Sequence, residues 1–173
     1  VVLELMSSRN VENAAVSKEN AVKYASDFLE KAGYTDMRES YYMTNENVCT
    51  VNFAYVQDGV CCYPDLIKVS VAMDNGEIVG FETMGYVMSH TQRDIPQAEV
   101  SREQAEGKVS PELTVLSHQM AVIPTDGKYE VYCHEFKCET DSGRHYIIYV
   151  NAQTGNEEKI LILIEDESGT LTL

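Results

Sequence analysis

The sequence is short of tryptophan, proline and basic residues. It has no tryptophan, four prolines and 13 lysines and arginines against 28 acidic residues in 173, for a net charge of −15. Nucleic acids and anionic membrane surfaces are bound by clustered lysine and arginine, so this charge argues against both. It would attract a basic partner, such as a cationic enzyme, and it is equally typical of a soluble acidic protein.

Long apolar segments are also missing. The longest apolar run covers residues 160–164, whereas a membrane-spanning helix needs about 20 residues. The chain shows no signal peptide, and its opening residues, VVLELM, read as a strand already under way. We interpret the chain as a fragment, so the absence of targeting signals carries little weight.

Motifs that carry chemistry are missing as well. The sequence has no Gly-x-Ser-x-Gly elbow, no glycine-rich phosphate loop and no second histidine at helical spacing from His134. Residues 74–77 (DNGE) could attract calcium, but an EF-hand loop needs more oxygen ligands, and a β-turn is the better interpretation. We therefore expect no catalytic residues and no cofactor, although an enzyme with an unrecognised site stays an alternative.

The five cysteines form an odd set, which argues against a disulfide framework. Cys61 and Cys62 are adjacent in an expected strand and so point to opposite faces. Cys133 and Cys138, with His134 and His145, offer ligand types for zinc, but strand alternation separates them. We expect no structural metal and interpret the thiols as small core residues.

What the sequence does contain is a repeat. The run VSKENA at residues 16–21 returns as VSREQA at residues 100–105. VAMDNGE at residues 71–77 is answered by IYVNAQTGNE at residues 148–157. Two landmarks in the same order and at similar spacing imply two copies of one small unit.

The repeat sets the expected domain boundaries. The segment between the two copies is polar and contains Pro96, which is typical of a linker. The opening residues look like the end of an earlier copy. The chain therefore divides into a tail strand of a preceding repeat at residues 1–11, a first repeat at 12–88, a linker at 89–99 and a second repeat at 100–173.

Each unit is expected to begin with a helix. Ser17 is placed to cap a helix at residues 18–32, with Gly33 just beyond its end. A capping box that starts at Ser101 opens a shorter helix. That helix should stop near Val109, because the following Ser-Pro pair disfavours helical backbone.

An antiparallel meander should follow each helix, with about four strands in each unit. Alternating apolar residues and turn signals place the strands at 37–43, 48–56, 66–73, 78–83, 113–123, 129–137, 145–150 and 158–165. The predicted fold class is therefore α+β, with one helix packed on an antiparallel sheet in each of two tandem units. Residues 160–164 are apolar on both faces, so we expect that strand to be covered on both sides.

These features resemble the PepSY family, named for peptidase propeptides and YpeB. The general signs are Ser-x-x-x-Ala at each helix start and Asp/Asn-x-Gly-Glu/Asn before a last strand, as at residues 74–77. More specific runs resemble the C-terminal part of YpeB spore-germination proteins over nearly the whole chain. They are YVQDGV at 55–60, YPDLIKV at 63–69, DNGEIVGFE at 74–82, IPT at 123–125 and YVNAQTG at 149–155.

The resemblance implies a non-catalytic role. Germination members of the family lie outside the inner spore membrane, held by an N-terminal anchor that this fragment lacks. They are needed to stabilise and restrain a cortex-lytic enzyme, a transglycosylase that cleaves peptidoglycan. The expected partner is therefore that enzyme, and the alternative is a small-ligand or protease-inhibitor-like sensor module outside the cell membrane. An apolar pocket between helix and sheet would support the sensor.

The expected partner-binding residues are Tyr63, Pro64, Asp65 and Tyr86. A proline within a strand run belongs on an edge or bulge where backbone is free. Tyr63 and Asp65 offer an aromatic anchor with a charge beside it, and the second unit has no equivalent of this segment. The alternative is a bulge that only shapes the sheet.

Overall fold

The computed structural model describes residues 2–127, 129–166 and 169–172. The fold is α+β, as the sequence predicts. The chain divides into two compact units, one made of residues 1–56, 64–91 and 165–170 and the other of residues 57–63, 92–164 and 171–173. Residues 57–63, a hairpin turn with the strand residues beside it, thus group with the second unit, and the expected repeat boundaries stay a prediction.

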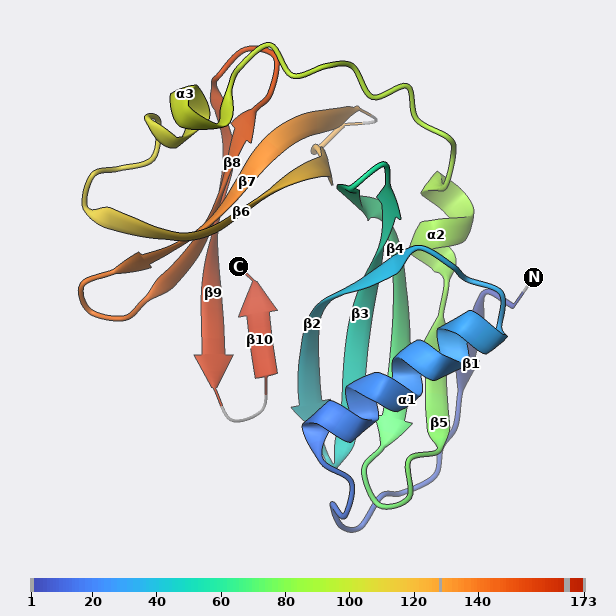
Figure 1. The fold of residues 1–173 in the computed structure, drawn as a ribbon. Helices are drawn as coiled ribbons and strands as arrows, with labels where there is room; N and C mark the ends of the chain where they lie inside the picture. The colour runs from blue at the N-terminus through green and yellow to red at the C-terminus, as the bar shows by residue number, and fades with distance from the viewer. Residues whose placement is uncertain (1, 128, 167–168, 173) are drawn as a thin grey trace. The chain divides into compact units, whose positions relative to one another are not determined.

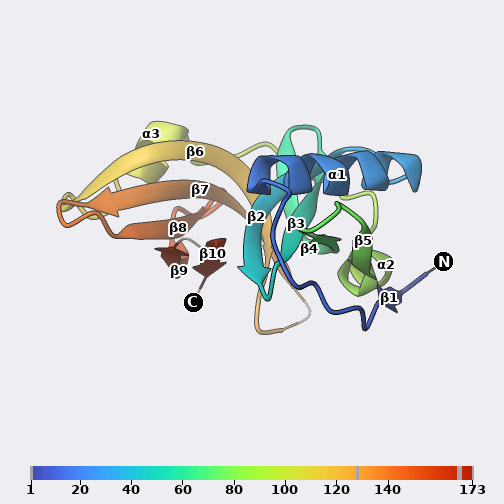
Figure 2. The ribbon, with the colours of Figure 1, turned by 90° about the horizontal axis from the view of Figure 1, so that it is seen from below.

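The first unit is a helix on a sheet. Its elements are β1 (Glu4–Met6), α1 (Lys18–Lys31), β2 (Met37–Asn45), β3 (Val48–Gln57), β4 (Val60–Ala72), β5 (Ile78–Glu82) and α2 (Met84–Ser89). The strands lie in the order β1-β5-β4-β3-β2. Figures 1 and 2 show α1 across one face of these strands, with the segment that leads into α1 passing on the other side.

The local sequence explains α1. The Ser17 hydroxyl accepts a hydrogen bond from the Asn20 amide at 3.2 Å, which satisfies an unpaired N–H at the helix start. Gly33 follows the helix with a φ of +87°, a conformation that glycine adopts without strain. The buried face packs on apolar residues of β3, β4 and β5, and its buried members are Ala21, Ala25 and Leu29.

The second unit repeats the plan with a much shorter helix. Its elements are α3 (Arg102–Glu106), β6 (Leu113–Pro124), β7 (Glu130–Thr140), β8 (His145–Asn151) and β9 (Glu157–Asp166), and β10 (Gly169–Thr172) ends the chain's secondary structure. The first four of these strands lie in the order β9-β8-β7-β6. The expected capping box is present at Ser101, but α3 ends at Glu106, before the predicted Val109.

Both units hold their helix start by the same backbone lock. In the first unit the two amides before Ser17 both donate to the carbonyl of Met73, at 2.7 Å each. In the second unit the two amides before Ser101 both donate to the carbonyl of Ala152, at 3.0 Å each. Met73 and Ala152 occupy matching positions in the two DNG-like turns. The lock therefore ties each helix start to the turn that precedes the last strand of its sheet.

The prediction that residues 160–164 are covered on both sides is wrong. Ile160, Ile162 and Ile164 are 47%, 44% and 43% exposed. Among the described residues, the core cluster under α3 takes its members from α3, the segments on either side of it, and strands β6, β7 and β8, but not from β9. A helix of five residues is too short to cover the last strand as well.

Candidate partner-binding surface

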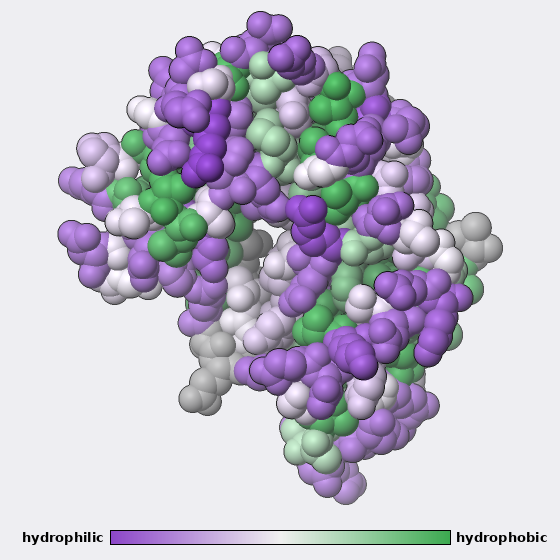
Figure 3. Space-filling model, in the orientation of Figure 1, coloured by the Kyte–Doolittle hydropathy of each residue, from purple (hydrophilic) through white to green (hydrophobic). Residues whose placement is uncertain are grey.

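The four residues expected at the partner surface do not all belong to one unit. Tyr63 lies in the second unit, whereas Pro64, Asp65 and Tyr86 lie in the first. The sequence reasoning grouped them because three are consecutive in the chain and the fourth is aromatic. Figure 3 shows that the visible face of the molecule is mostly hydrophilic, with separate apolar groups among the polar side chains.

Tyr63 belongs to a polar cluster inside the second unit. The side-chain amide of Gln119 donates to the Tyr63 hydroxyl at 3.3 Å and to a Glu135 carboxylate oxygen at 2.8 Å. The ring of Tyr149 meets the Tyr63 ring edge-on, with centroids 6.3 Å apart. Glu135 and Tyr149 are buried. The hydroxyl of Tyr63 is thus directed into its own unit.

The chemistry of this cluster is that of a structural network. Burial, with the nearby Glu135 carboxylate, raises the pKa of Tyr63 and of Tyr149 well above the ordinary value. Both phenols therefore keep their protons. A buried carboxylate is stabilised by donors of this kind, and its removal would leave them without an acceptor.

Asp65, the charge expected beside the aromatic anchor, is buried and paired rather than at the surface. Its side chain has 0% exposure, and one carboxylate oxygen lies 2.8 Å from Nδ1 of His90. A buried carboxylate must find a partner, because desolvation of an unpaired charge is costly. His90 stands 25 residues further along the chain, so no local pattern marks the pair.

Tyr86 lies in an aromatic cluster of the first unit. Its ring stacks on the His90 ring, with centroids 4.1 Å apart and planes inclined by 13°. The edges of Tyr34 and Tyr55 meet it at 5.2 and 6.3 Å. Tyr86 is half-buried, so part of its surface could still meet a partner. Of the four expected residues, it is the one whose role as an anchor fits its exposure best.

Pro64 lies within β4 and next to a helix that sequence reasoning missed. The ladder between β4 and β5 begins at Lys68, so Pro64 lies outside it, as its missing N–H requires. The backbone there is not free, because α2 packs on it. A Cβ on Gly85 would meet the carbonyl oxygens of Leu66 and Pro64 at 3.0 and 3.3 Å. Glycine thus allows α2 to approach the strand.

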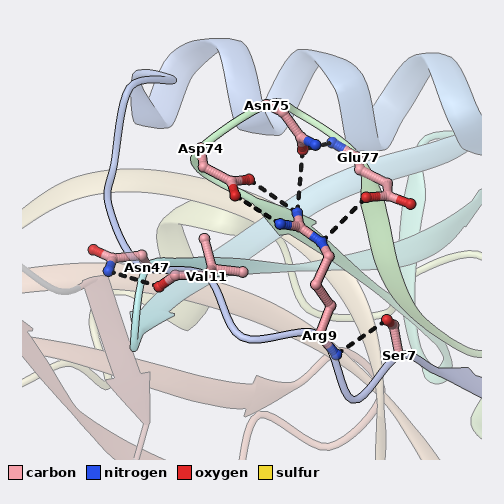
Figure 4. Close-up of polar contacts among 7 residues, drawn as sticks. All are labelled: Ser7, Arg9, Val11, Asn47, Asp74, Asn75 and Glu77. Atoms are coloured by element: carbon pink, nitrogen blue, oxygen red, sulfur yellow. Dashed lines mark hydrogen bonds and ion pairs between the residues drawn. The ribbon is translucent and has the colours of Figure 1, made fainter.

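An arginine fastens the segment that leads into α1. Arg9 makes two bonds to the carboxylate of Asp74, at 2.6 and 2.9 Å, and further contacts to Asn75 and Glu77 at 3.2 Å each (Figure 4). The bonds from Arg9 hold the pKa of Asp74 below its usual range. Residues 74–77 (DNGE) therefore bind a guanidinium of the same chain, in a turn that sequence analysis interpreted as only structural.

A second arginine does the same for the segment that leads into α3. Arg93 makes a two-point contact with Glu130, at 2.7 and 2.8 Å, and its side chain is 7% exposed. The Gln57 side chain bonds both the N–H and the carbonyl of Arg93. Arg9 and Arg93 precede their Ser caps by the same number of residues, so the repeat itself was the signal that could have found them.

A histidine pair holds the start of α3. One ring nitrogen of His134, Nε2, lies 2.9 Å from the carbonyl of Val100, which can only accept, so Nε2 carries the proton. In the neutral ring the other nitrogen is then an acceptor, and His118 Nε2 donates to it at 2.9 Å. Burial, with His134 close by, lowers the pKa of His118. The pair therefore positions Val100, and its outer member, His118, is held toward the neutral form.

The remaining reactive groups are the five cysteine thiols, and burial keeps them unreactive. All five cysteines are free and buried, which confirms their interpretation as core residues. Burial raises the pKa of Cys133 to about 12 and that of Cys49 and Cys138 above its ordinary value, so all three stay thiols. Within residues 2–127, 129–166 and 169–172, no cluster of His, Cys, Asp or Glu could hold a metal ion.

A recess lies beside the segment that leads into α3. It has a volume of about 490 Å³, and its lining includes Gln57, Asp58, Arg93, Ile95 and Tyr132. Most of these side chains are polar, and the side chain of Gln57 already bonds the backbone of Arg93. The recess thus lies at the expected linker, away from the space between helix and sheet where a sensor ligand was expected.

The described residues include no helix long and apolar enough to cross a membrane.

Comparison with known proteins places these units in a family. Residues 1–96 match the family described as YpeB sporulation, PepSY1 and PepSY2 domains. The sporulation protein YpeB of Halalkalibacterium halodurans is 33% identical over 162 residues, 94% of this chain and 36% of that protein. YpeB of Bacillus subtilis is 29% identical over 160 residues, 90% of this chain and 35% of that protein. The chain thus spans about a third of the length of these relatives.

A solved structure gives the same result for the fold. The C-terminal domain of YpeB from Bacillus megaterium superposes with a TM-score of 0.86 at 29% identity. The match covers 94% of this chain and 72% of that one. The fold, with its helices and antiparallel strands, is therefore shared with a protein of known structure.

Proposed function

The chain belongs to the YpeB sporulation family with PepSY domains, and from this premise we propose that it is a non-catalytic module that binds a cortex-lytic enzyme. The module would stabilise that peptidoglycan-cleaving transglycosylase and restrain it until germination. It would act in the spore, on the outer side of the inner membrane, held by an anchor elsewhere in the full protein. Its acidic charge suits a basic enzyme surface.

One observation carries the proposal beyond family membership. Three buried side chains that could do acid–base chemistry are engaged in holding the fold. Asp65 pairs with His90, His134 positions Val100, and Glu135 binds Gln119. An enzyme needs at least one such group directed at a site that a substrate can reach. A binding module does not.

The character of the recess beside Arg93 favours protein binding over the sensor alternative. A small-ligand sensor needs an enclosed, mostly apolar pocket with a few polar groups. The recess beside Arg93 is polar, and the Gln57–Arg93 bonds occupy one side of it. We therefore propose protein binding, with the chain divided into a tail strand, two repeats and a linker at the boundaries given above.

The test is co-purification of the full-length protein with its lytic enzyme from spore extracts, followed by a pull-down with this chain. We expect this chain to capture the enzyme and to slow its digestion of purified cortex peptidoglycan. Tyr86→Ala should weaken capture, because the ring is half-buried and partly accessible. Tyr129→Ala is a matched control, since Tyr129 is 81% exposed and lies in the other unit.

The proposal fails if the folded chain neither captures the enzyme nor changes its rate. Capture that is equal for Tyr86→Ala and for wild type would show that the partner is right and the surface wrong. A reproducible turnover of peptidoglycan by the chain alone, abolished by a single substitution, would show that the module is an enzyme.

A further inference from the structure

Phe81 in β5 and Ile160 in β9 occupy matching positions in the two units. Phe81 pairs with Val69 of β4, and Ile160 pairs with Ile148 of β8. Val69 belongs to the core under α1, and Ile148 to the core under α3. Directly opposite residues of an antiparallel pair point to the same face. Phe81 and Ile160 therefore both face the helix side of their sheet.

Phe81 and Ile160 differ sharply in how much of the side chain is exposed. Phe81 is 8% exposed, because the rings of Phe28 and Tyr34 meet it edge-on with centroids 5.1 and 5.8 Å away. Ile160 is 47% exposed. Counted from the Ser caps, Glu112 stands where Phe28 stands in the first unit. The helical turns that cover β5 thus have no counterpart over β9.

The uncovered residues form a row that we call the β9 ridge, made of Ile160, Ile162 and Ile164. Alternate residues of a strand share a face, so all three lie on the helix side. The ridge is about 14 Å long at the usual rise of a strand. α1 has 14 residues and α3 has 5. The missing helix of about nine residues would also be about 14 Å long.

Acidic residues stand at both ends of the ridge. Glu157 and Glu158 precede it and Glu165 follows it in the sequence. The net charge of the chain is −15. A segment that binds here gains from basic residues beyond its apolar face and loses from acidic ones. The first unit shows which kind of segment fits, because there a helix with an apolar face covers the matching strand.

We propose that the β9 ridge binds an amphipathic helix of a partner protein, with apolar residues along one face and basic residues at its ends. The helix supplies in trans the layer that the second half of α1 supplies within the first unit. This is recognition of a helix by an apolar surface through anchors one turn apart. The inference concerns this surface and holds whichever protein supplies the helix, so it stands or falls separately from the lytic-enzyme assay.

The experiment uses this chain and a synthetic helical peptide with leucines at i, i+4 and i+7 and lysines at both ends. Binding is measured by fluorescence anisotropy, and the site by the methyl NMR signals of the isoleucines. We expect saturable binding to wild type that shifts the signals of the β9 ridge and leaves that of the buried Ile67 unchanged. Ile160→Ser plus Ile162→Ser should weaken binding at least about tenfold.

Three controls make each outcome decisive. Met88→Ser removes a side chain that is 75% exposed in the first unit and should bind like wild type. A scrambled peptide and one with glutamate for lysine should both bind more weakly. Equal binding by the double variant, by the scrambled peptide or by the acidic peptide overturns the proposal. So does self-association of the chain that the double variant abolishes, because the occupant would then be a second copy.

Discussion

The two units begin their helices in the same way and then cover their sheets to different extents. Each helix starts at a capped serine, behind a pair of amides that share one carbonyl of the facing turn. α1 then continues for 14 residues and α3 for 5. The comparison shows that the start of the helix is fixed by the repeat, whereas the area of sheet that it covers is set by the residues after the first turn.

The interiors differ as well. The core under α1 is built from aliphatic and aromatic side chains, with Cys49 and Met73 among them. The second unit buries the polar side chains of His134 and Glu135. Gln119 donates to Glu135, and His134 bonds to His118. Apolar packing tolerates change in small steps, whereas a buried polar network fails when one member is removed. The core under α1 should therefore respond to lost volume, and the buried polar network of the second unit to lost partners.

The largest expected effect comes from the helix layer itself. Leu29 is 1% exposed under α1, and Leu29→Ala should lower the free energy of unfolding by about 3 kcal/mol, through lost burial and the cavity left behind. Ile160→Ala in the second unit should lower it by less than about 1 kcal/mol, because that side chain is already 47% exposed. Urea unfolding followed by circular dichroism measures both. Similar losses for the two variants would mean that the β9 ridge is covered in solution.

The two arginine contacts come next. Arg93→Ala should cost on the order of 2 kcal/mol, because a guanidinium that is 7% exposed leaves the Glu130 carboxylate without its partner. Arg9→Ala should cost less, since both Arg9 and Asp74 are more exposed and water can replace the bond. Raising the salt concentration should reduce the effect of Arg9→Ala more than that of Arg93→Ala. A reversed order in urea unfolding would contradict the burial of Arg93.

The helix caps provide the closest match between the units. Ser17→Ala and Ser101→Ala should each lower stability by about 1 kcal/mol, because each removes the acceptor for one unpaired amide. The effects should be alike, since both serines accept from the third residue of the helix at 3.2 Å. Ser8→Ala, outside any helix, is the control. A cap effect in only one unit would show that the other helix start is held by the backbone lock alone.

The smallest expected effect is on the pH dependence of stability, and it comes from His118 in the second unit. The pKa of His118 in the folded protein is lowered by burial, so the unfolded chain binds the proton more tightly. Stability should therefore fall as the pH drops through about 6.5 and continue to fall until the folded-state pKa is passed. His118→Gln should remove part of this slope. Tyr34→Phe, a change in the first unit that removes no histidine, should leave the slope between pH 7 and 5 unchanged.

The sequence predicted α1 because three independent signals agree there. A capping serine, apolar residues on one face and a terminal glycine all mark residues 18–32, and the helix runs over Lys18–Lys31. The meander was also predictable, since alternation and turns are local. α2 was not, because its six residues bury no side chain and Thr83 makes no side-chain cap bond among the described contacts. A helix held by close approach to a strand leaves no periodic pattern.

The candidate site was less predictable for the same reason. Exposure depends on what packs against a residue from elsewhere in the chain. The charge of Asp65 suggested a surface position, and only the fold brings His90 to it. The isoleucines of the β9 ridge suggested a covered strand, but their cover depends on the length of a helix some fifty residues earlier, which Gly107 and Pro111 cut short. For the Arg9 and Arg93 contacts, the repeat was the only sequence signal that could have predicted them.

The buried thiols have a consequence for how motion in this chain can be recorded. Cys49 lies in the first unit, and the other four cysteines lie in the second. A thiol-specific reagent reaches such a sulfur only during a transient opening of its surroundings, so the labelling rate in native buffer reports the frequency of that opening. Mass spectrometry resolves the modified positions. The labelling rates of Cys49 and of the other four cysteines therefore report opening of the first and second unit separately. Binding of a partner to one unit would slow labelling of the cysteines in that unit.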